Sequence, residues 1–92
     1  MIRTFADKDT EALFLGNRVR KFVNIETVAR RKLAQLNAAA TLNFLRVPPG
    51  NRLEVLKGDR AGLYSIRIND QYRVIFRWSD GDVFDVELVD YH

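Results

Sequence analysis

Three side chains able to exchange protons stand together at the end of this sequence. Asp90, Tyr91 and His92 directly follow an alternating apolar run, and His92 is the only histidine among 92 residues. An imidazole changes charge near neutral pH, which makes histidine the commonest general acid or base. The run 83–89 is typical of a β-strand that carries these side chains out of a sheet. The alternative interpretation is an unconstrained tail, because chain ends commonly fray.

Two arginines are expected to lie opposite each other in the same sheet. If residues 69–71 form a three-residue hairpin loop, Ile68 faces Tyr72 and Arg67 faces Arg73. A two-residue loop would set apolar residues against polar ones, so the hydrophobic pattern argues against it. The sequence therefore predicts a cross-strand arginine pair.

Such a like-charge pair costs stability unless something negative lies between its members. We expect either a bound anion there or a carboxylate, for which Glu87 is the candidate. The same parity places Asp90 beside Tyr72, with the last two residues just beyond. The anion interpretation is favoured because the terminal acid–base residues lie next to the arginines.

The elements that position these residues change from helical to strand periodicity at Pro48-Pro49-Gly50. Before it, we expect a short strand at 2–5, a helix capped by Asp7 or Asp9 and ended by Gly16, and a longer helix capped by Asn24. After it, period-two runs predict a strand near 53–56 and three antiparallel strands in which Arg73 faces Val89, Trp78 faces Phe84 and Arg77 forms a structural pair with Asp85. The fold class is therefore predicted as α+β, with two helices packed on one face of a small antiparallel sheet.

Length and composition narrow the class of protein. The chain has 92 residues, of which 47% are hydrophobic, which fits one domain over residues 1–92. It has no cysteine, so neither a disulfide framework nor a cysteine-rich zinc site is expected, and a reducing cytoplasm is the simpler setting. No signal segment and no apolar run of about 18 residues that could span a membrane is recognised.

Charge is distributed unevenly along the chain. Residues 1–46 hold nine Lys and Arg against four Asp and Glu, a net charge of +5, whereas residues 47–92 hold six against eight, a net charge of −2. The excess is concentrated in two clusters, Arg18, Arg20 and Lys21, then Arg30, Arg31 and Lys32. A basic face favours a polyanionic partner, and a solvated helix surface is the alternative.

Several short motifs together resemble a known family. They are Leu56-Lys57-Gly58-Asp59-Arg60-Ala61-Gly62, Tyr64-Ser65-Ile66-Arg67, Asn69-Asp70-Gln71-Tyr72-Arg73-Val74, Gly81-Asp82 and Val89-Asp90-Tyr91-His92. In this order they resemble the HigB-like branch of the RelE/ParE toxin superfamily. The resemblance implies a compact α+β toxin of a bacterial toxin–antitoxin pair. Similar toxins enter the ribosomal A site and cut messenger RNA.

The resemblance also implies the site. Lys57, Arg73, Asp90, Tyr91 and His92 match the family's active-site pattern. Glu54 departs from it, because some HigB toxins have a histidine in this strand. A carboxylate can serve as a base there only where burial or a neighbouring negative charge makes it more basic.

These residue types suit RNA cleavage by attack of the 2′-hydroxyl on the neighbouring phosphate, without a metal or cofactor. Fixed cations at Arg73 and Lys57 would stabilise the developing charge, and Asp90, His92 or Glu54 would transfer protons. Tyr91 could stack on a base. Further RNA contacts are expected from cations outside this centre, Arg60, Arg67, Arg18, Arg20, Lys21, Arg30 and Arg31.

The expected partners are a HigA-like helix-turn-helix antitoxin, in a heterotetramer, and the ribosome with its mRNA; the free toxin is expected to be a monomer with no membrane partner. Two other functions remain open. One is a non-catalytic ParE-like poison that binds DNA gyrase. Glu54 keeps this alternative open, because it departs from the family's active-site pattern. The other is a decayed toxin that only binds its antitoxin.

Overall fold

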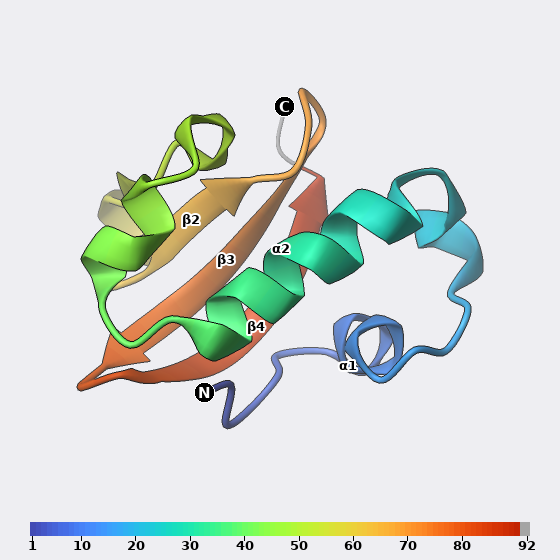
Figure 1. The fold of residues 1–92 in the computed structure, drawn as a ribbon, viewed down its shortest axis with the longest axis horizontal. Coiled ribbons are helices and arrows are strands. Elements are labelled where there is room, and N and C mark those ends of the chain that lie inside the picture. The colour runs from blue at the N-terminus through green and yellow to red at the C-terminus, as the bar shows by residue number, and fades with distance from the viewer. Residues whose placement is uncertain (91–92) are drawn as a thin grey trace.

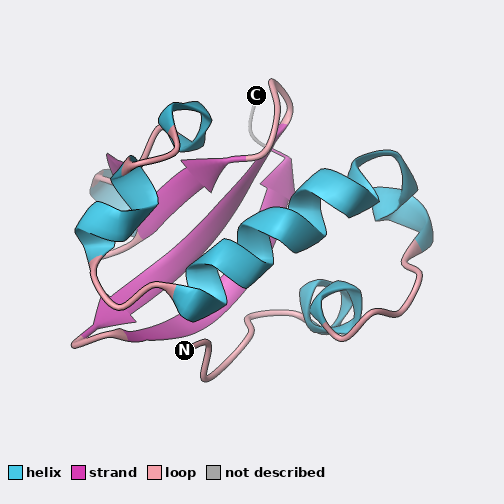
Figure 2. Cartoon of the chain, viewed as in Figure 1, coloured by secondary structure: helices cyan, strands magenta, loops and turns pink. Residues whose placement is uncertain are grey.

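The computed structural model describes residues 1–90. It shows a twisted antiparallel sheet with helices across one face (Figures 1 and 2). The four strands lie in the order β1-β2-β3-β4, which confirms the predicted α+β class. The strands are β1 (Glu54–Val55), β2 (Tyr64–Arg67), β3 (Tyr72–Ser79) and β4 (Asp82–Asp90). The α-helices are α1 (Lys8–Phe14) and α2 (Glu26–Ala38), and 3-10 turns form η1 (Arg20–Ile25), η2 (Leu42–Arg46), η3 (Pro49–Asn51) and η4 (Gly58–Arg60).

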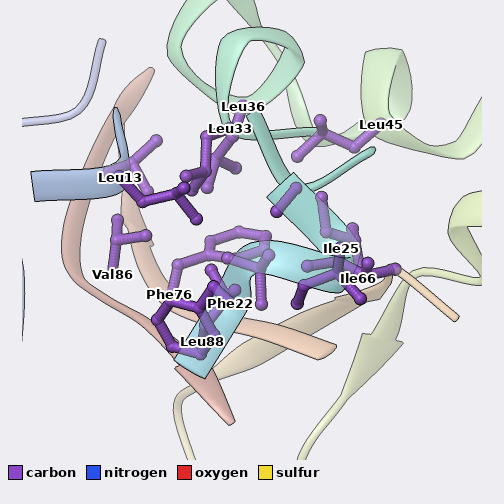
Figure 3. Close-up of a cluster of buried hydrophobic side chains, with 14 of the residues drawn as sticks. Leu13, Phe22, Ile25, Leu33, Leu36, Leu45, Ile66, Phe76, Val86 and Leu88 are labelled. Carbon is purple, nitrogen blue, oxygen red and sulfur yellow. The ribbon is translucent and has the colours of Figure 1, made fainter. Parts of the chain in front are cut away.

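Helix α2 crosses one face of the sheet and supplies much of the core (Figure 1). Its apolar side chains recur every three or four residues, so they share one face of the helix. Leu33 and Leu36 on this face are fully buried and belong to the same cluster as Ile66, Val74 and Phe76 of the sheet (Figure 3). The predicted period is therefore the one that builds the core.

The helix boundaries follow the predicted signals only in part. Asp7 caps α1 by accepting a hydrogen bond from the Thr10 amide at 3.3 Å, as predicted, and Gly16 follows the helix at a φ of +94°. Asn24, however, is not the cap of α2. It lies inside η1, which leads directly into α2 and makes Ile25 the N-cap.

The N-terminal segment covers the outer edge of β4. The predicted strand at 2–5 is reduced to two isolated parallel bridges, which join Ile2 to Val83 and Phe5 to Val86. Edge strands attract unwanted pairing when they are left open, so this cover protects β4. Further along the same edge, the Thr10 hydroxyl accepts a hydrogen bond from the Leu88 amide at 3.0 Å.

The hairpin between β2 and β3 has the predicted register. Arg67 is paired with Arg73, and the Ile68 amide donates to the Tyr72 carbonyl at 3.0 Å. Asn69 stabilises the loop, because its side-chain oxygen accepts hydrogen bonds from the amides of Gln71 and Tyr72.

The register between β3 and β4 corrects one part of the prediction. Near the end of β4, Arg73 pairs with Val89 and Tyr72 with Asp90, as expected. A bulge then adds Asp85 to β4, at a φ of +56°, and moves the later pairs by one residue. Trp78 consequently pairs with Val83 and Arg77 with Phe84, rather than with Phe84 and Asp85. Arg77 still reaches the Asp85 carboxylate, with Nε 3.4 Å from Oδ2.

No helix within residues 1–90 combines the length and the apolar character that crossing a bilayer requires.

Replacing Thr10 by valine should destabilise the fold by about 1 to 3 kcal/mol, because the buried Leu88 amide would lose its acceptor without any loss of volume. Urea denaturation measures the change, and amide hydrogen exchange locates it at Leu88. Thr10→Ser is the matched control, since it keeps the hydroxyl. Equal loss of Leu88 protection in both variants would contradict this role for the hydroxyl.

Candidate functional site opposite helix α2

Arg73 lies at the centre of the sheet face that α2 does not cover. Its side chain is only 7% exposed and extends from β3 across β2 to the start of β1. Nε donates to Ser65 Oγ at 2.8 Å, and Nη2 donates to the Arg52 carbonyl at 2.6 Å. A planar guanidinium held at two edges has a fixed orientation, so Arg73 presents its charge in one direction.

This face is lined by the residues that alternate with the core positions. Ser65 is fully buried and Ile75 is nearly so, but neither belongs to the cluster under α2. Successive side chains of a strand point to opposite faces, so Ser65, Ile75 and Arg73 share the second face. Glu54 is paired with Ser65 and joins them there.

Glu54 is the acidic neighbour of Arg73. Its Oε1 lies 3.6 Å from Arg73 Nη1, and its side chain is 51% exposed, against 9% for that of Arg73. Glu54 is therefore half-exposed and lies beside a cation, whereas a strong base at this position would need burial or a negative neighbour. Instead it lies beside the guanidinium on the solvent side.

The two paired arginines each have a carboxylate of their own. Arg67 Nη2 contacts Asp70 Oδ1, across the turn of the hairpin, while Arg73 has Glu54. The alternative in which Glu87 lies between the arginines does not fit the sheet, because Glu87 pairs with Ile75 from β4, on the far side of β3 from Arg67. These two carboxylates reduce the repulsion between the arginines, and the Asp70 side chain is fully exposed.

Lys57 and Arg60 lie at the open end of β1. Lys57 is exposed at the N-cap position of η4, three residues after Glu54, and Arg60 is exposed at the end of that turn. The structure therefore brings Glu54, Arg73 and Arg67 together on one face, with Lys57 in the segment that continues from β1.

Asp90 closes β4 next to this face. It pairs with Tyr72, on the rung after the Arg73–Val89 pair, and its Oδ2 accepts a hydrogen bond from Gln71 Nε2 at 3.0 Å. Because side chains alternate along a strand, the Asp90 side chain lies on the same face of the sheet as Tyr72, and not on the face of Arg73. The predicted site residues Tyr91 and His92 lie outside the residues that the structure describes.

The first basic cluster is partly neutralised by acidic neighbours. Lys21 Nζ lies 3.0 Å from Asp9 Oδ2, and this hydrogen bond raises the pKa of Lys21 above its usual value of 10.5. Arg18 Nε lies 3.9 Å from Glu26 Oε2. Arg20 is exposed at the start of η1.

Arg30 differs from the adjacent Arg31 in what it contacts. Arg30 donates to the Leu13 carbonyl at 3.1 Å and the Asn17 carbonyl at 2.8 Å, and it pairs with Glu26 at 3.1 Å. It therefore ties the end of α1 to α2, which is a structural role. Arg31 is exposed one position further along the helix, where it can meet an external anion.

Sequence reasoning missed two groups that hold Arg73. Ser65 was visible in principle, because it lies two residues from Arg67 on the face that Arg67 and Arg73 share. The Arg52 carbonyl had no such signal, since it comes from irregular backbone. Residues 1–90 contain no group of three or more His, Cys, Asp or Glu side chains arranged to hold a metal ion.

Comparison with known proteins gives a family for this chain. The sequence model described as "RelE-like toxin of type II toxin-antitoxin system HigB" matches residues 3–92. The chain is 43% identical over 90 residues to "Toxin HigB-1" of Vibrio cholerae, covering 96% of this chain and 95% of that protein. It is also 39% identical over 41 residues to "Endoribonuclease HigB" of Proteus vulgaris, covering 45% of each chain.

Solved structures agree on the fold. The toxin–antitoxin complex YoeB-YefM of Staphylococcus aureus, a heterotetramer, contains a chain that matches with a TM-score of 0.62 at 18% identity, over 100% of this chain and 98% of that one. The motifs around Lys57, Arg73 and Asp90, the full-length match and this shared fold agree. The chain belongs to the HigB family of RelE-like toxins of type II toxin–antitoxin systems.

Proposed function

We propose that this toxin is a metal-independent endoribonuclease that cuts messenger RNA on the ribosome, with Arg73 binding the phosphate at the cleavage point. The observation that carries the proposal is the fixed guanidinium of Arg73. It is held by Ser65 and Arg52 on the inside and covered outside by the half-exposed Glu54 carboxylate.

A guanidinium held in this way suits the charge that develops during RNA cleavage. When the 2′-hydroxyl attacks the phosphate, negative charge grows on the phosphate oxygens. Preorganised cations stabilise that charge more in the transition state than in the ground state. Arg73 supplies a fixed donor edge, and the exposed Lys57 supplies a mobile second cation.

Proton transfer is assigned to the end of β4. His92 removes the 2′ proton or protonates the leaving 5′ oxygen, or Asp90 does so by reaching around the end of β4 from the side of Tyr72. Each such transfer contributes roughly 10²- to 10⁴-fold. Tyr91 stacks on a base or orients the phosphate. Glu54 is less suited to this work, because it is exposed beside a cation. We propose instead that the RNA phosphate displaces the Glu54 carboxylate from Arg73 when it binds.

The ribosome supplies what this site lacks. Arg73 is nearly buried, so a flexible RNA must adopt one geometry to reach it. A ribosome that holds the codon in a reactive geometry can contribute several kcal/mol through positioning alone. Exposed cations such as Arg20 and Arg31 would bind ribosomal RNA phosphates. A ribosomal target also puts the toxin in the cytoplasm.

The partner that restrains this activity is an antitoxin, as the family implies. The neutralising protein is proposed to be of the helix-turn-helix type. Its complex with the toxin is proposed to be a heterotetramer, an assembly named for the Staphylococcus aureus complex of the same fold.

A second candidate function rests on Glu54. If the site lacks an effective base, the toxin could instead act without cutting, by binding DNA gyrase as ParE-like toxins do. That function predicts DNA damage on expression and intact RNA on translating ribosomes, so mapping the 5′ ends of cellular RNA after expression of the toxin separates the two.

Replacing Lys57 by glutamine should lower kcat/KM for mRNA cleavage by about 10²-fold, because one cation facing the transition state is removed. The measurement is the rate at which mapped 5′ ends appear on translating ribosomes with limiting toxin. Lys8→Gln is the control, since Lys8 is also exposed and its loss changes the net charge equally. Cleavage by Lys57→Gln at the rate of the control would count against a catalytic role.

Replacing Glu54 by glutamine should leave kcat within about threefold of wild type and lower KM, because the carboxylate competes with phosphate for Arg73 and gives no essential proton transfer. Single-turnover cleavage on programmed ribosomes separates the two constants. A fall in kcat of about 10²-fold or more would instead identify Glu54 as the base.

The neighbours Arg30 and Arg31 should respond differently to glutamine substitution. Arg31→Gln should weaken ribosome binding and reduce the salt slope of log K by about one, with normal stability, because it removes one phosphate contact. Arg30→Gln should instead lower the free energy of unfolding by about 1 to 3 kcal/mol, because two carbonyls and Glu26 lose a charged donor. Equal effects on binding and stability would contradict the distinction.

A further inference from the structure

Helix α2 carries a lysine that is unusual because it is buried, and this lysine has no part in the proposed reaction. Lys32 is only 8% exposed, and lysine is rarely buried to this degree without a partner. Burial lowers the pKa of Lys32 below its usual value of 10.5, and the nearby charges of Arg31 and Arg67 lower it further. Within residues 1–90, no carboxylate forms an ion pair with Lys32.

The ammonium group of Lys32 is bound by a fully buried asparagine. Lys32 Nζ donates to Asn51 Oδ1. Asn51 Nδ2 donates in turn to the Leu45 carbonyl at 3.1 Å and to Gln35 Oε1 at 3.4 Å. The side chain of Asn51 thus uses its acceptor and both of its donor hydrogens, and it joins η3 to both η2 and α2.

The residue after Asn51 is the one that holds Arg73. Arg52 has a φ of +45° and a ψ of +59°, a left-handed conformation that residues other than glycine rarely adopt. Such a conformation persists only where its surroundings fix it. In this conformation the Arg52 carbonyl accepts the 2.6 Å hydrogen bond from Arg73 Nη2. The backbone therefore links the buried asparagine to the proposed phosphate-binding group.

We propose that Asn51, held by Lys32, is a positioning residue for Arg73. The connection runs from Lys32 on α2 to Asn51 in η3, then through the Arg52 backbone to Arg73 on the other face of the sheet. It gives the buried lysine a role, since an apolar side chain at position 32 would leave Asn51 Oδ1 without this donor. The inference rests on the proposed role of Arg73.

The alternative is that Lys32 and Asn51 only stabilise the fold. Both roles lower stability when the contact is removed, so a melting temperature does not separate them. Hydrogen exchange of the Arg73 Nε–H separates the two roles, because its rate reports directly on whether the guanidinium is held against Ser65. This proton can be followed by ¹H–¹⁵N NMR and assigned by its loss in Arg73→Lys.

The first test is Lys32→Met, which keeps the length of the side chain and removes the ammonium group. Exchange of the Arg73 Nε–H should accelerate and kcat for cleavage on ribosomes should fall, each about tenfold or more, with KM within about twofold, because Lys32 is buried away from RNA and acts through geometry. Lys8→Met, an exposed lysine with the same charge change, should alter neither. A folded Lys32→Met protein with wild-type exchange would overturn the proposal.

Two further variants keep the test decisive. Asn51→Asp retains an acceptor for Lys32 but loses both Nδ2 donors, so it should fold even where Lys32→Met does not. Exchange of the Arg73 Nε–H should again accelerate. An unchanged rate would overturn the proposal. Adding Arg52→Gly to Lys32→Met should slow exchange again, because glycine adopts the left-handed conformation without strain. No recovery would exclude the route through Arg52.

The exchange measurement also separates this inference from the proposed function. If wild-type toxin cuts no RNA but the variants loosen Arg73, the positioning role stands and the endonuclease proposal fails. If the toxin cuts RNA and the variants leave Arg73 exchange unchanged, the endonuclease proposal stands and the positioning role fails.

Discussion

The side chain of Arg73 joins three strands of the sheet, and the proposed chemistry depends on this one contact set. A nearly buried guanidinium needs partners on every edge, since an uncompensated buried charge is costly. Ser65 on β2, the Arg52 carbonyl and Glu54 on β1 meet that need. Of these partners, Glu54 alone is a half-exposed side chain, so it is the one that an incoming phosphate could replace without disturbing the sheet.

The two faces of the sheet divide the work of the protein. Leu33 and Leu36 of α2 pack on the face that carries Val74 and Phe76, and this core holds the helix against the strands. The opposite face carries the polar residues that alternate with those positions. A strand such as β3 can therefore serve stability and chemistry at once, because its side chains alternate in direction.

The sequence allowed prediction of the features that follow a regular period. The apolar spacing in α2, the hairpin register that pairs Arg67 with Arg73, and the pairing of Tyr72 with Asp90 were all correct. The errors arose where the period is broken. The bulge at Asp85 shifts the pairs by one residue, and Asn24 lies in a 3-10 turn rather than at a helix cap. The Arg52 carbonyl could not be predicted, because backbone groups of irregular segments leave no side-chain pattern.

RNA phosphate should take the place of Glu54 on Arg73, and a structure of the toxin on a ribosome tests this directly. The A-site codon would carry a 2′-O-methyl group, so that attack on the phosphate is blocked. We expect a phosphate oxygen within hydrogen-bonding distance of Arg73 Nη1, with the Glu54 carboxylate displaced and the contacts to Ser65 and Arg52 intact. A phosphate bound elsewhere, with Glu54 still paired to Arg73, would show that Arg73 is not the phosphate-binding group.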